Sequence, residues 1–199
     1  MNSPNNPEPS NLAIYMQQAL RPISNKYLYS SYVNSLPLRS YYKLLEFGSG
    51  IGAMAELLAR RLNEGQLTCV DISNRYLTKA KKNLKDYPNT TFFKGKLVNL
   101  DLQHGEFDAI NIHYVLHDVL KENRESLLAE MFELLQPGGK VFLREPLNDR
   151  HGMPSEEIEE LFANAGFYPL CVEKKKVRFF GEVYTACFTK IPEMRYFLS

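Results

Sequence analysis

The sequence has little net charge and no long apolar segment. Its 24 lysines and arginines nearly balance 23 aspartates and glutamates, which leaves a formal net charge of +1 at pH 7. A protein that works mainly on the phosphate backbone needs clustered positive charge, so this balance argues against nucleic acid as a partner. A membrane-spanning helix needs roughly 18 consecutive apolar residues, and no such run occurs. We therefore expect no membrane span.

Cysteine is also scarce, with only Cys69, Cys171 and Cys187 along the chain. Three scattered thiols are too few for a disulfide framework or a four-thiolate zinc site. We expect buried free thiols, as in a reducing cytoplasm. The opening residues, MNSPNNPEPSN, contain neither a basic start nor an apolar stretch, so we expect no signal peptide. Both observations favour a cytoplasmic location.

The length and the apolar content indicate one domain preceded by a short N-terminal region. The chain has 199 residues, and 44% of them are apolar, which is enough for a hydrophobic core. Residues 1–10 hold three prolines, three asparagines and two serines, so we expect a flexible tail. Residues 11–40 show a weak helical pattern that Pro22 and Pro37 are expected to break into short pieces. We expect this segment to form a helical lid over the domain that follows.

From residue 43 on, the patterns typical of strands and helices alternate. The expected strands are 43–47, 66–71, 90–97, 107–113, 140–145, 167–179 and 182–190. The expected helices are 52–63, a lysine-rich helix capped by Ser73, 125–135 and 155–166. This alternation predicts an α/β fold with a doubly wound parallel sheet, which the closing hairpin makes mixed.

The sharpest feature is a glycine-rich loop between the first expected strand and the first helix. Its sequence, EFGSGIG, places Gly48 and Gly50 where the backbone turns tightly and approaches a ligand, and Gly52 where the helix begins. The N-terminus of that helix points free N–H groups toward the ligand. Asp71 ends the second strand, where a carboxylate accepts hydrogen bonds from ribose hydroxyls. The combination predicts a site for an adenosine-containing cofactor.

Glu46 bears on which cofactor this is. Read as Gly48-x-Gly50-x-x-Ala53, the loop also fits a dinucleotide fingerprint. A carboxylate two positions before the first glycine would repel a pyrophosphate and attract a cation, such as the methionyl ammonium of S-adenosylmethionine (SAM). We therefore expect SAM. The alternative is that Glu46 is a solvated residue at the end of the strand.

Five motifs, taken in order and spacing, resemble those of class I SAM-dependent methyltransferases. The similarity covers about residues 42–190 and is carried by LLEFGSGIG, VDIS, FDAINIHYVLHDV, LLQPGGKVFLREP and ELFANAGF. Within that family, the chain resembles small-molecule enzymes such as those of ubiquinone and menaquinone biosynthesis. The resemblance implies a SAM-binding methyltransferase domain over residues 41–199. It also implies a Rossmann-like mixed sheet of seven strands, in the order 3-2-1-4-5-7-6 with strand 7 antiparallel.

The resemblance further implies SAM as cofactor and a set of cofactor-binding residues. These are Glu46, Gly48, Ser49, Gly50, Gly52, Asp71, Ile72, Lys96, Leu97 and His113. One position departs from the family pattern, because Gly95-Lys96-Leu97 replaces the usual Gly-Asp-Ala. Lysine offers only donors, so Lys96 cannot accept from the adenine amine, although backbone N–H groups can still hold the ring. This departure supports an alternative, a non-catalytic SAM-binding or partner subunit.

His113 ends the fourth strand, where the family often places a polar residue beside the transferred methyl group. His113 is a candidate general base, because imidazole can remove a proton from an acceptor hydroxyl near neutral pH. The alternative is that His113 packs under the methionine end of the cofactor, since methyl transfer to a good nucleophile needs only alignment. His117 and Asp118 lie beyond a turn, and no HExxH pattern is present. We therefore expect no metal.

The acceptor is expected to be small and either partly apolar or ring-shaped. Tyrosines in the N-terminal segment would give it an apolar wall with polar tips. The expected substrate-binding residues are Tyr15, Tyr27, Tyr32, Tyr114 and His117. The sequence thus predicts a SAM-dependent methyltransferase for such an acceptor. The alternatives are the partner subunit and an NAD-linked oxidoreductase, and a homodimer is compatible with any of them.

Overall fold

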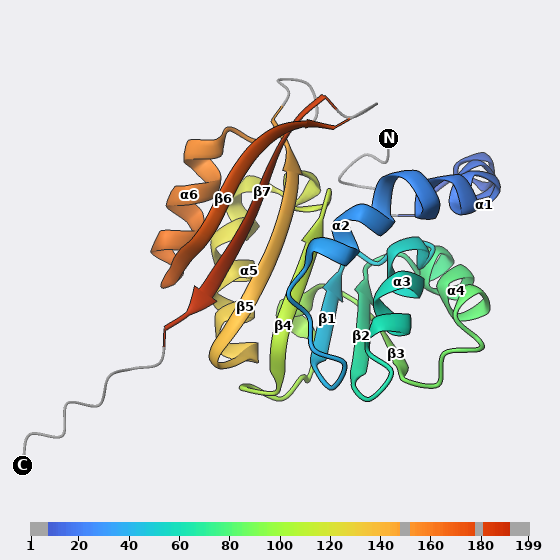
Figure 1. The fold of residues 1–199 in the computed structure, drawn as a ribbon, viewed down its shortest axis with the longest axis horizontal. Helices are drawn as coiled ribbons and strands as arrows, with labels where there is room; N and C mark the ends of the chain where they lie inside the picture. Colours follow the sequence, from blue (N-terminus) through green and yellow to red (C-terminus); the bar gives the residue numbers. More distant parts are fainter. Residues whose placement is uncertain (1–7, 148–151, 178–180, 192–199) are drawn as a thin grey trace, which may run out of the picture.

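A computed structural model describes residues 8–147, 152–177 and 181–191, and its centre is one seven-stranded sheet (Figure 1). The strands are β1 (Lys43–Phe47), β2 (Gln66–Asp71), β3 (Thr90–Lys94), β4 (Phe107–His113), β5 (Leu135–Pro146), β6 (Phe167–Val177) and β7 (Gly181–Lys190). Their order is β3-β2-β1-β4-β5-β7-β6. The first five strands pair in parallel, whereas β7 runs antiparallel to β5 and β6. The predicted fold class and strand order are confirmed.

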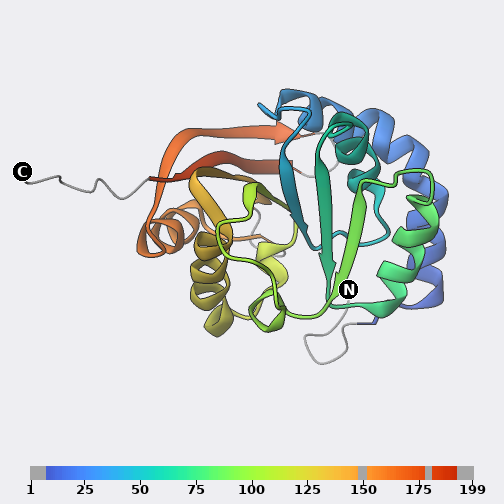
Figure 2. The same ribbon diagram turned by 90° about the horizontal axis from the view of Figure 1, so that it is seen from below.

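Helices cover both faces of this sheet, as a doubly wound fold requires. They are α1 (Asn11–Ser24), α2 (Ser30–Ser35), α3 (Ala53–Arg61), α4 (Asn74–Asn83), α5 (Lys121–Leu134) and α6 (Ser155–Asn164). Three short turns are η1 (Asn25–Tyr29), η2 (Leu97–Asn99) and η3 (Leu116–Asp118). Buried residues of α2 and α3 share an apolar cluster with one face of the sheet, and those of α5 and α6 share another with the opposite face. Figure 2 shows these two layers from below.

The N-terminal segment forms one nearly continuous helical rod over residues 11–35, made of α1, η1 and α2. The expected break at Pro22 is wrong, because Pro22 lies inside α1. A proline in a helix removes one backbone hydrogen bond, and here a π-helical turn, η1, follows it directly. Hydrogen bonds from Gln18 to Asn83 and from Asn25 to Glu56 hold the rod against α4 and α3. These tertiary contacts offset the effect of the proline.

The rod turns an apolar stripe toward solvent and polar side chains toward the domain. No residue of α1 is buried. The exposed stripe consists of Leu12, Tyr15, Met16, Leu20, Ile23 and Tyr27. On the other side, Gln17 donates to the Tyr76 hydroxyl at 3.0 Å, and the Arg21 guanidinium lies 3.7 Å from Glu56. The fully buried apolar side chains of the rod are Tyr32 and Val33 of α2, and Tyr29 of η1 packs partly buried against the same cluster.

Glu8 joins the start of the described chain to the first turn of α4. Its carboxylate accepts hydrogen bonds from the Ser73 hydroxyl at 2.8 Å and from the backbone N–H groups of Asn74 and Arg75 at 2.9 and 3.2 Å. A carboxylate is favourable there because a helix N-terminus presents unpaired N–H groups. Residue 8 therefore has defined contacts, although the composition predicts a tail. Residues 1–7 of that expected tail lie outside the described residues.

A few boundaries and one cysteine differ from expectation. β3 ends at Lys94 because Gly95, with φ of +148°, turns the chain toward η2. α5 begins at Lys121 instead of residue 125. Cys171 is exposed, because β6 is the edge strand of the sheet, whereas the other two thiols are buried as predicted. Positions 178 and 179 of the expected sixth strand lie outside the described residues. Within residues 8–147, 152–177 and 181–191, no helix is long and apolar enough to cross a membrane.

Candidate active site

Two rows of side chains cross the sheet on the face that α2 and α3 cover. Because side chains alternate along a strand, residues in register on neighbouring strands share one face. The first row contains Cys69, Glu46, Asn111, Phe142 and Cys187. The second row, two residues nearer the carboxyl ends, contains Asp71, His113, Arg144 and Thr185. An open α/β sheet binds its ligand outside the carboxyl ends of the strands, so the second row borders that position.

The glycine loop is fixed from β2 by Asp71. Gly50 has φ of +53°, and its N–H donates to Asp71 Oδ2 at 2.8 Å. A Cβ at Gly50 would meet no atom within 4 Å, so the loop opens there onto free space. A Cβ at Gly52 would overlap the Leu84 side chain, and one at Gly48 would touch Val115. Of the three loop glycines, Gly50 therefore borders the space that a ligand could fill, and the other two allow close packing.

Glu46 is a buried carboxyl group, and no cation of the described residues forms an ion pair with it. Among the described residues, its side chain has one hydrogen-bond partner, the Cys69 thiol, at a distance of 4.0 Å between Sγ and Oε2. Burial, and secondarily the charge of Asp71, raises the pKa of Glu46 to about 8. Burial also raises the pKa of Asp71, although hydrogen bonds from the N–H groups of Ser73 and Gly50 oppose that shift. A cation placed beside Glu46 would restore its charged form.

The loop residues fit a ligand that carries an ammonium group and a ribose. Glu46 supplies the buried carboxyl group, and Gly50 supplies the open space. Ser49 adds a buried hydroxyl group that has no hydrogen-bond partner among the described residues. The Asp71 carboxylate lies at the end of β2, where a carboxylate can accept hydrogen bonds from ribose hydroxyls.

Three further residues expected to bind the cofactor differ in their exposure. Ile72 is 49% exposed and offers an apolar surface beside the end of β2. Lys96 is exposed, whereas the side chain of Leu97 is buried in the core. Leu97 can therefore face a ligand only through its backbone N–H, which lies in the first turn of η2 and needs no partner within that turn.

His113 lies at the end of β4 inside a cluster of aromatic rings. The ring centroids of Tyr29, Tyr32 and Tyr114 lie 5.4, 5.0 and 4.1 Å from that of the imidazole. The ring nitrogen Nε2 is buried and has no hydrogen-bond partner among the described residues. Burial, and secondarily the charge of Arg144, lowers the pKa of His113 to about 3. The imidazole is therefore neutral at physiological pH and can accept a hydrogen bond at Nε2.

Arg144 lies beside His113 in the same row and was not among the site residues expected from the sequence. Its guanidinium carbon lies 4.1 Å from the centre of the Tyr32 ring, and its Nε donates to the Thr185 hydroxyl at 3.2 Å. The Tyr32 hydroxyl donates in turn to Asn111 Oδ1 at 3.0 Å. The available signal was the charged residue within the apolar run VFLRE, because an arginine is rarely fully buried unless it is paired.

Two of the five expected substrate-binding residues join this cluster. Tyr32 is 1% exposed and Tyr114 contacts the imidazole, so both lie beside His113. Tyr15 and Tyr27 are 72% and 67% exposed on the outer stripe of the rod, so the structure does not bring them to the cluster. Tyr29, from the same tyrosine-rich segment, is in contact instead.

His117, the fifth expected contact, binds a carboxylate on the opposite face of the sheet. Its Nδ1 lies 2.6 Å from Oε2 of Glu145, which is fully buried at the end of β5. Burial alone would lower the pKa of His117, but the hydrogen bond and the charge of Glu145 outweigh this effect and raise it. His117 and Glu145 thus hold the η3 turn that follows β4. No group of three or more potential metal ligands occurs among the residues that the structure describes.

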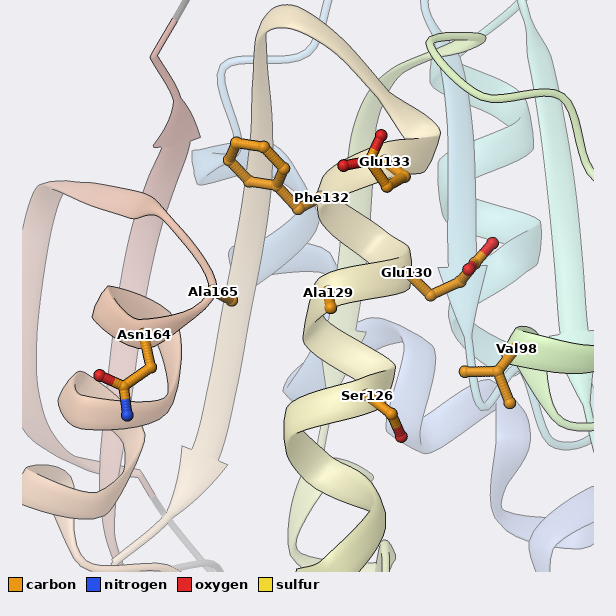
Figure 3. A pocket seen from close by; sticks show the side chains of 8 residues that line it. All are labelled: Val98, Ser126, Ala129, Glu130, Phe132, Glu133, Asn164 and Ala165. Atoms are coloured by element: carbon orange, nitrogen blue, oxygen red, sulfur yellow. The ribbon is translucent and has the colours of Figure 1, made fainter.

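A surface hollow of about 480 Å³ lies elsewhere, between α5, the end of α6 and η2 (Figure 3). Its lining includes Ala129, Phe132 and the carboxylates of Glu130 and Glu133. Glu130 lies 3.6 Å from the ring of His104, a surface ion pair when that histidine is protonated. The hollow belongs to the α5 and α6 side of the sheet, away from the row of His113. It shares no residue with the candidate active site.

Residues 44–139 match a family model described as a methyltransferase domain. The matched range contains the glycine loop, Asp71 and His113. Together with the strand order, the match supports the resemblance to class I SAM-dependent methyltransferases, a family whose cofactor is S-adenosylmethionine. The sequence-based recognition of the family is confirmed.

Similar proteins extend this assignment. The chain is 28% identical over 123 residues to a ubiquinone/menaquinone biosynthesis C-methyltransferase of Shewanella pealeana, covering 60% of this chain and 48% of that protein. It is 32% identical over 111 residues to a carboxy-S-adenosyl-L-methionine synthase of Shewanella piezotolerans, covering 53% and 44%. The chain thus matches about half the length of these relatives. A SAM-dependent methyltransferase from Aquifex aeolicus shares the fold, with a TM-score of 0.74, 15% identity and coverage of 96% of this chain and 100% of that one.

Proposed function

We propose that this chain transfers a methyl group from SAM to a small, partly apolar or ring-shaped acceptor. The observation that carries the proposal is the position of His113, which ends β4 in the row of Asp71 and is surrounded by three tyrosine rings. The row joins the two halves of the reaction, because the cofactor residues lie at one end and the aromatic cluster at the other. The relatives named above act in quinone biosynthesis and in the synthesis of carboxy-S-adenosyl-L-methionine, which supports a small acceptor.

The roles of the residues follow from their chemistry. Bound SAM supplies a methyl group that its sulfonium makes electrophilic. Glu46 would bind the ammonium group and Asp71 the ribose hydroxyls, while Gly50 leaves room for the ligand. Tyr29 and Tyr32 would hold a flat acceptor and exclude water from it.

The neutral His113 would accept a hydrogen bond at Nε2 from the nucleophilic hydroxyl or amine of the acceptor. This bond aligns the nucleophile with the methyl group. A pKa of about 3 makes the imidazole a weak base, so alignment is the larger part of the proposed role, and proton removal the smaller. Tyr15 and Tyr27 stay outside this proposed site.

A non-catalytic SAM-binding subunit is the second candidate. It is favoured by Lys96, which stands where the family usually has an acid for the adenine amine.

Free thiols fit a cytoplasmic location, which we include in the proposal. The proposed reaction needs no nucleic acid and no second copy of the chain.

Two measurements test these candidates. The first compares the melting temperature of the full chain with SAM, with its demethylated product S-adenosylhomocysteine (SAH), and with NAD. A shift with NAD alone would contradict both candidates. The second incubates the chain with methyl-labelled SAM and fractionated metabolite extracts. Label in a small molecule supports the enzyme, whereas tight SAH binding without transfer from any fraction supports the non-catalytic subunit.

A further inference from the structure

The guanidinium of Arg144 is a buried cation, and none of the described residues places an anion beside it. The residue is 4% exposed, and among the described residues it forms no ion pair. Within the same part of the chain, the guanidinium forms one hydrogen bond, from Nε to the neutral Thr185 hydroxyl. A guanidinium carries five N–H donors, so the outer edge of the group remains for another partner. Burial of a charge is costly unless the charge is paired, and Arg144 thus lacks the partner that its environment calls for.

Two acids close to Arg144 in sequence or in strand register are engaged elsewhere. Glu145 follows Arg144 in sequence, but its carboxylate accepts hydrogen bonds from η3 and His117 on the opposite face of the sheet. Glu173 lies in the same row, one strand beyond Thr185, and forms an ion pair with Lys175 at 2.7 Å. Neither of these carboxylates compensates the charge of Arg144.

The surroundings of the guanidinium are those of a small-molecule site. Arg144 is in register with His113, whose Nε2 is also without a partner among the described residues. The Tyr32 ring covers one side of the guanidinium at 4.1 Å. A cation, an unpaired acceptor nitrogen and several aromatic rings therefore converge at the carboxyl ends of β4 and β5. The contact with Tyr32 is a cation–π interaction, which attracts the charge but supplies no oxygen acceptor for the remaining N–H donors.

We propose that Arg144 binds an anionic oxygen group, a carboxylate or a phosphate, on the methyl acceptor. The inference rests on the proposed methyl transfer and makes its substrate class more specific: an acceptor with a flat ring and a negative charge. The guanidinium binds one end of the acceptor, the tyrosines hold the ring, and His113 receives the hydrogen bond of the nucleophile. Arginine suits this role because its planar fork can bind two oxygens at once.

The test uses the full chain saturated with SAH and three ring-shaped probes: benzoate, phenyl phosphate and the neutral benzamide. Binding is measured by calorimetry. We expect one of the two anions to bind at least tenfold more tightly than benzamide, and the preferred anion distinguishes a carboxylate from a phosphate. In Arg144→Gln, this ratio should fall to near one while SAH affinity stays within twofold. The matched control, Arg60→Gln on the exposed surface of α3, should keep the ratio.

The outcomes separate the two proposals. If SAH does not bind, the proposed function fails before the probes are used. If SAH binds and the wild-type chain binds benzamide as tightly as both anions, or if Arg144→Gln retains the preference, the inference about Arg144 is wrong and the proposed function stands. Should Arg144→Gln not fold, the side-chain Nε–H resonance of Arg144 in the wild-type chain decides. A shift of this resonance with an anion but not with benzamide supports the inference, and its invariance overturns it.

Discussion

Glu145 and His117 form a polar link between the sheet and the turn that follows β4. The Glu145 carboxylate accepts hydrogen bonds from the backbone N–H groups of Val115 and Leu116 at 2.9 and 2.7 Å, and it lies 2.6 Å from His117 Nδ1. The carboxylate is fully buried, so its loss or the loss of its partner leaves an unpaired group inside the protein. This link fixes the backbone next to His113.

We expect His117 to make the stability of the protein depend on pH. Glu145 raises the pKa of His117 above its usual value of 6.5. The folded chain therefore binds the proton more tightly than the unfolded chain does. The extra stability is fully present below pH 6.5 and is lost as the pH rises through the raised pKa of the folded state. Thermal unfolding from pH 5 to pH 9 measures it.

Two variants separate charge from hydrogen bonding at this position. His117→Gln keeps a donor for Glu145 and should remove only the pH dependence. His117→Ala should also cost about 1.5–3 kcal/mol, the usual scale for a hydrogen bond to a charged group. His104→Gln, at an exposed surface position, is the control for the substitution of a histidine by glutamine. An unchanged profile in His117→Gln would contradict the assignment.

His113 should show the opposite behaviour. Because its pKa is lowered to about 3, the unfolded chain takes up a proton near pH 6.5 and the folded chain does not. This residue therefore costs stability progressively as the pH falls from about 6.5 toward 3, and His113→Asn should reduce that loss. The activity of the wild type should show no histidine titration near pH 6.5.

The turnover of His113 variants tests alignment against proton removal. We expect His113→Asn to keep kcat within about tenfold, because asparagine can still align the acceptor through a hydrogen bond. A loss of about 10²–10⁴ in both His113→Asn and His113→Ala, with SAH affinity unchanged, would instead establish a general base. Steady-state kinetics over the pH range provides the measurement.

Glu46 should couple cofactor binding to the release of a proton. In the free protein its pKa is about 8, so most of the carboxyl group is neutral at pH 7. The ammonium group of SAH would favour the charged form, and the displaced proton should appear in solution. Calorimetry in two buffers with different ionisation enthalpies counts that proton. Glu46→Gln should abolish the release and weaken SAH binding by about 1.5–3 kcal/mol.

A second readout for Glu46 needs no ligand. Because the pKa of Glu46 is raised in the folded state, this residue costs the protein stability progressively as the pH rises from 4.5 toward 8. Glu46→Gln should therefore gain stability relative to the wild type at pH 8.

The control for the calorimetric experiment is Glu56→Gln on α3, which should release the same proton on SAH binding as the wild type. Equal proton release by wild type and Glu46→Gln would show that another group titrates on binding.

The loop glycines permit a matched comparison. Gly50 and Gly105 both have positive φ, at +53° and +71°, and both face open space. Alanine at either position should impose a similar backbone strain of about 1–2 kcal/mol. Only Gly50→Ala should also weaken SAH binding, because only this Cβ enters the proposed ligand space. Gly52→Ala should mainly destabilise the fold, since its Cβ overlaps Leu84. Equal SAH affinity in Gly50→Ala and Gly105→Ala would show that the cofactor does not bind against Gly50.

The strand order and the glycine loop could be predicted because they depend on local pattern and on a family resemblance. The aromatic cluster could not, because it depends on how the rod lies on the sheet. Tyr29 and Tyr32 are indistinguishable from Tyr15 and Tyr27 in the sequence, yet only the first pair faces His113. Arg144 was missed for a related reason, since its importance comes from the registers that place it between His113 and Thr185.

The π-helical turn η1 determines which side of α1 meets the domain. A π turn accommodates one residue more than an α turn, and each residue of an α-helix advances the direction of the side chains by about 100°. Deleting one residue of η1 would therefore rotate α1 by about that angle relative to α2, which Tyr32 holds in place. Gln17 and Arg21 would lose their contacts with Tyr76 on α4 and Glu56 on α3, and the exposed apolar stripe would rotate about the helix axis. In this segment, a change of a single residue in length would give the molecule a different outer surface without altering the character of any side chain.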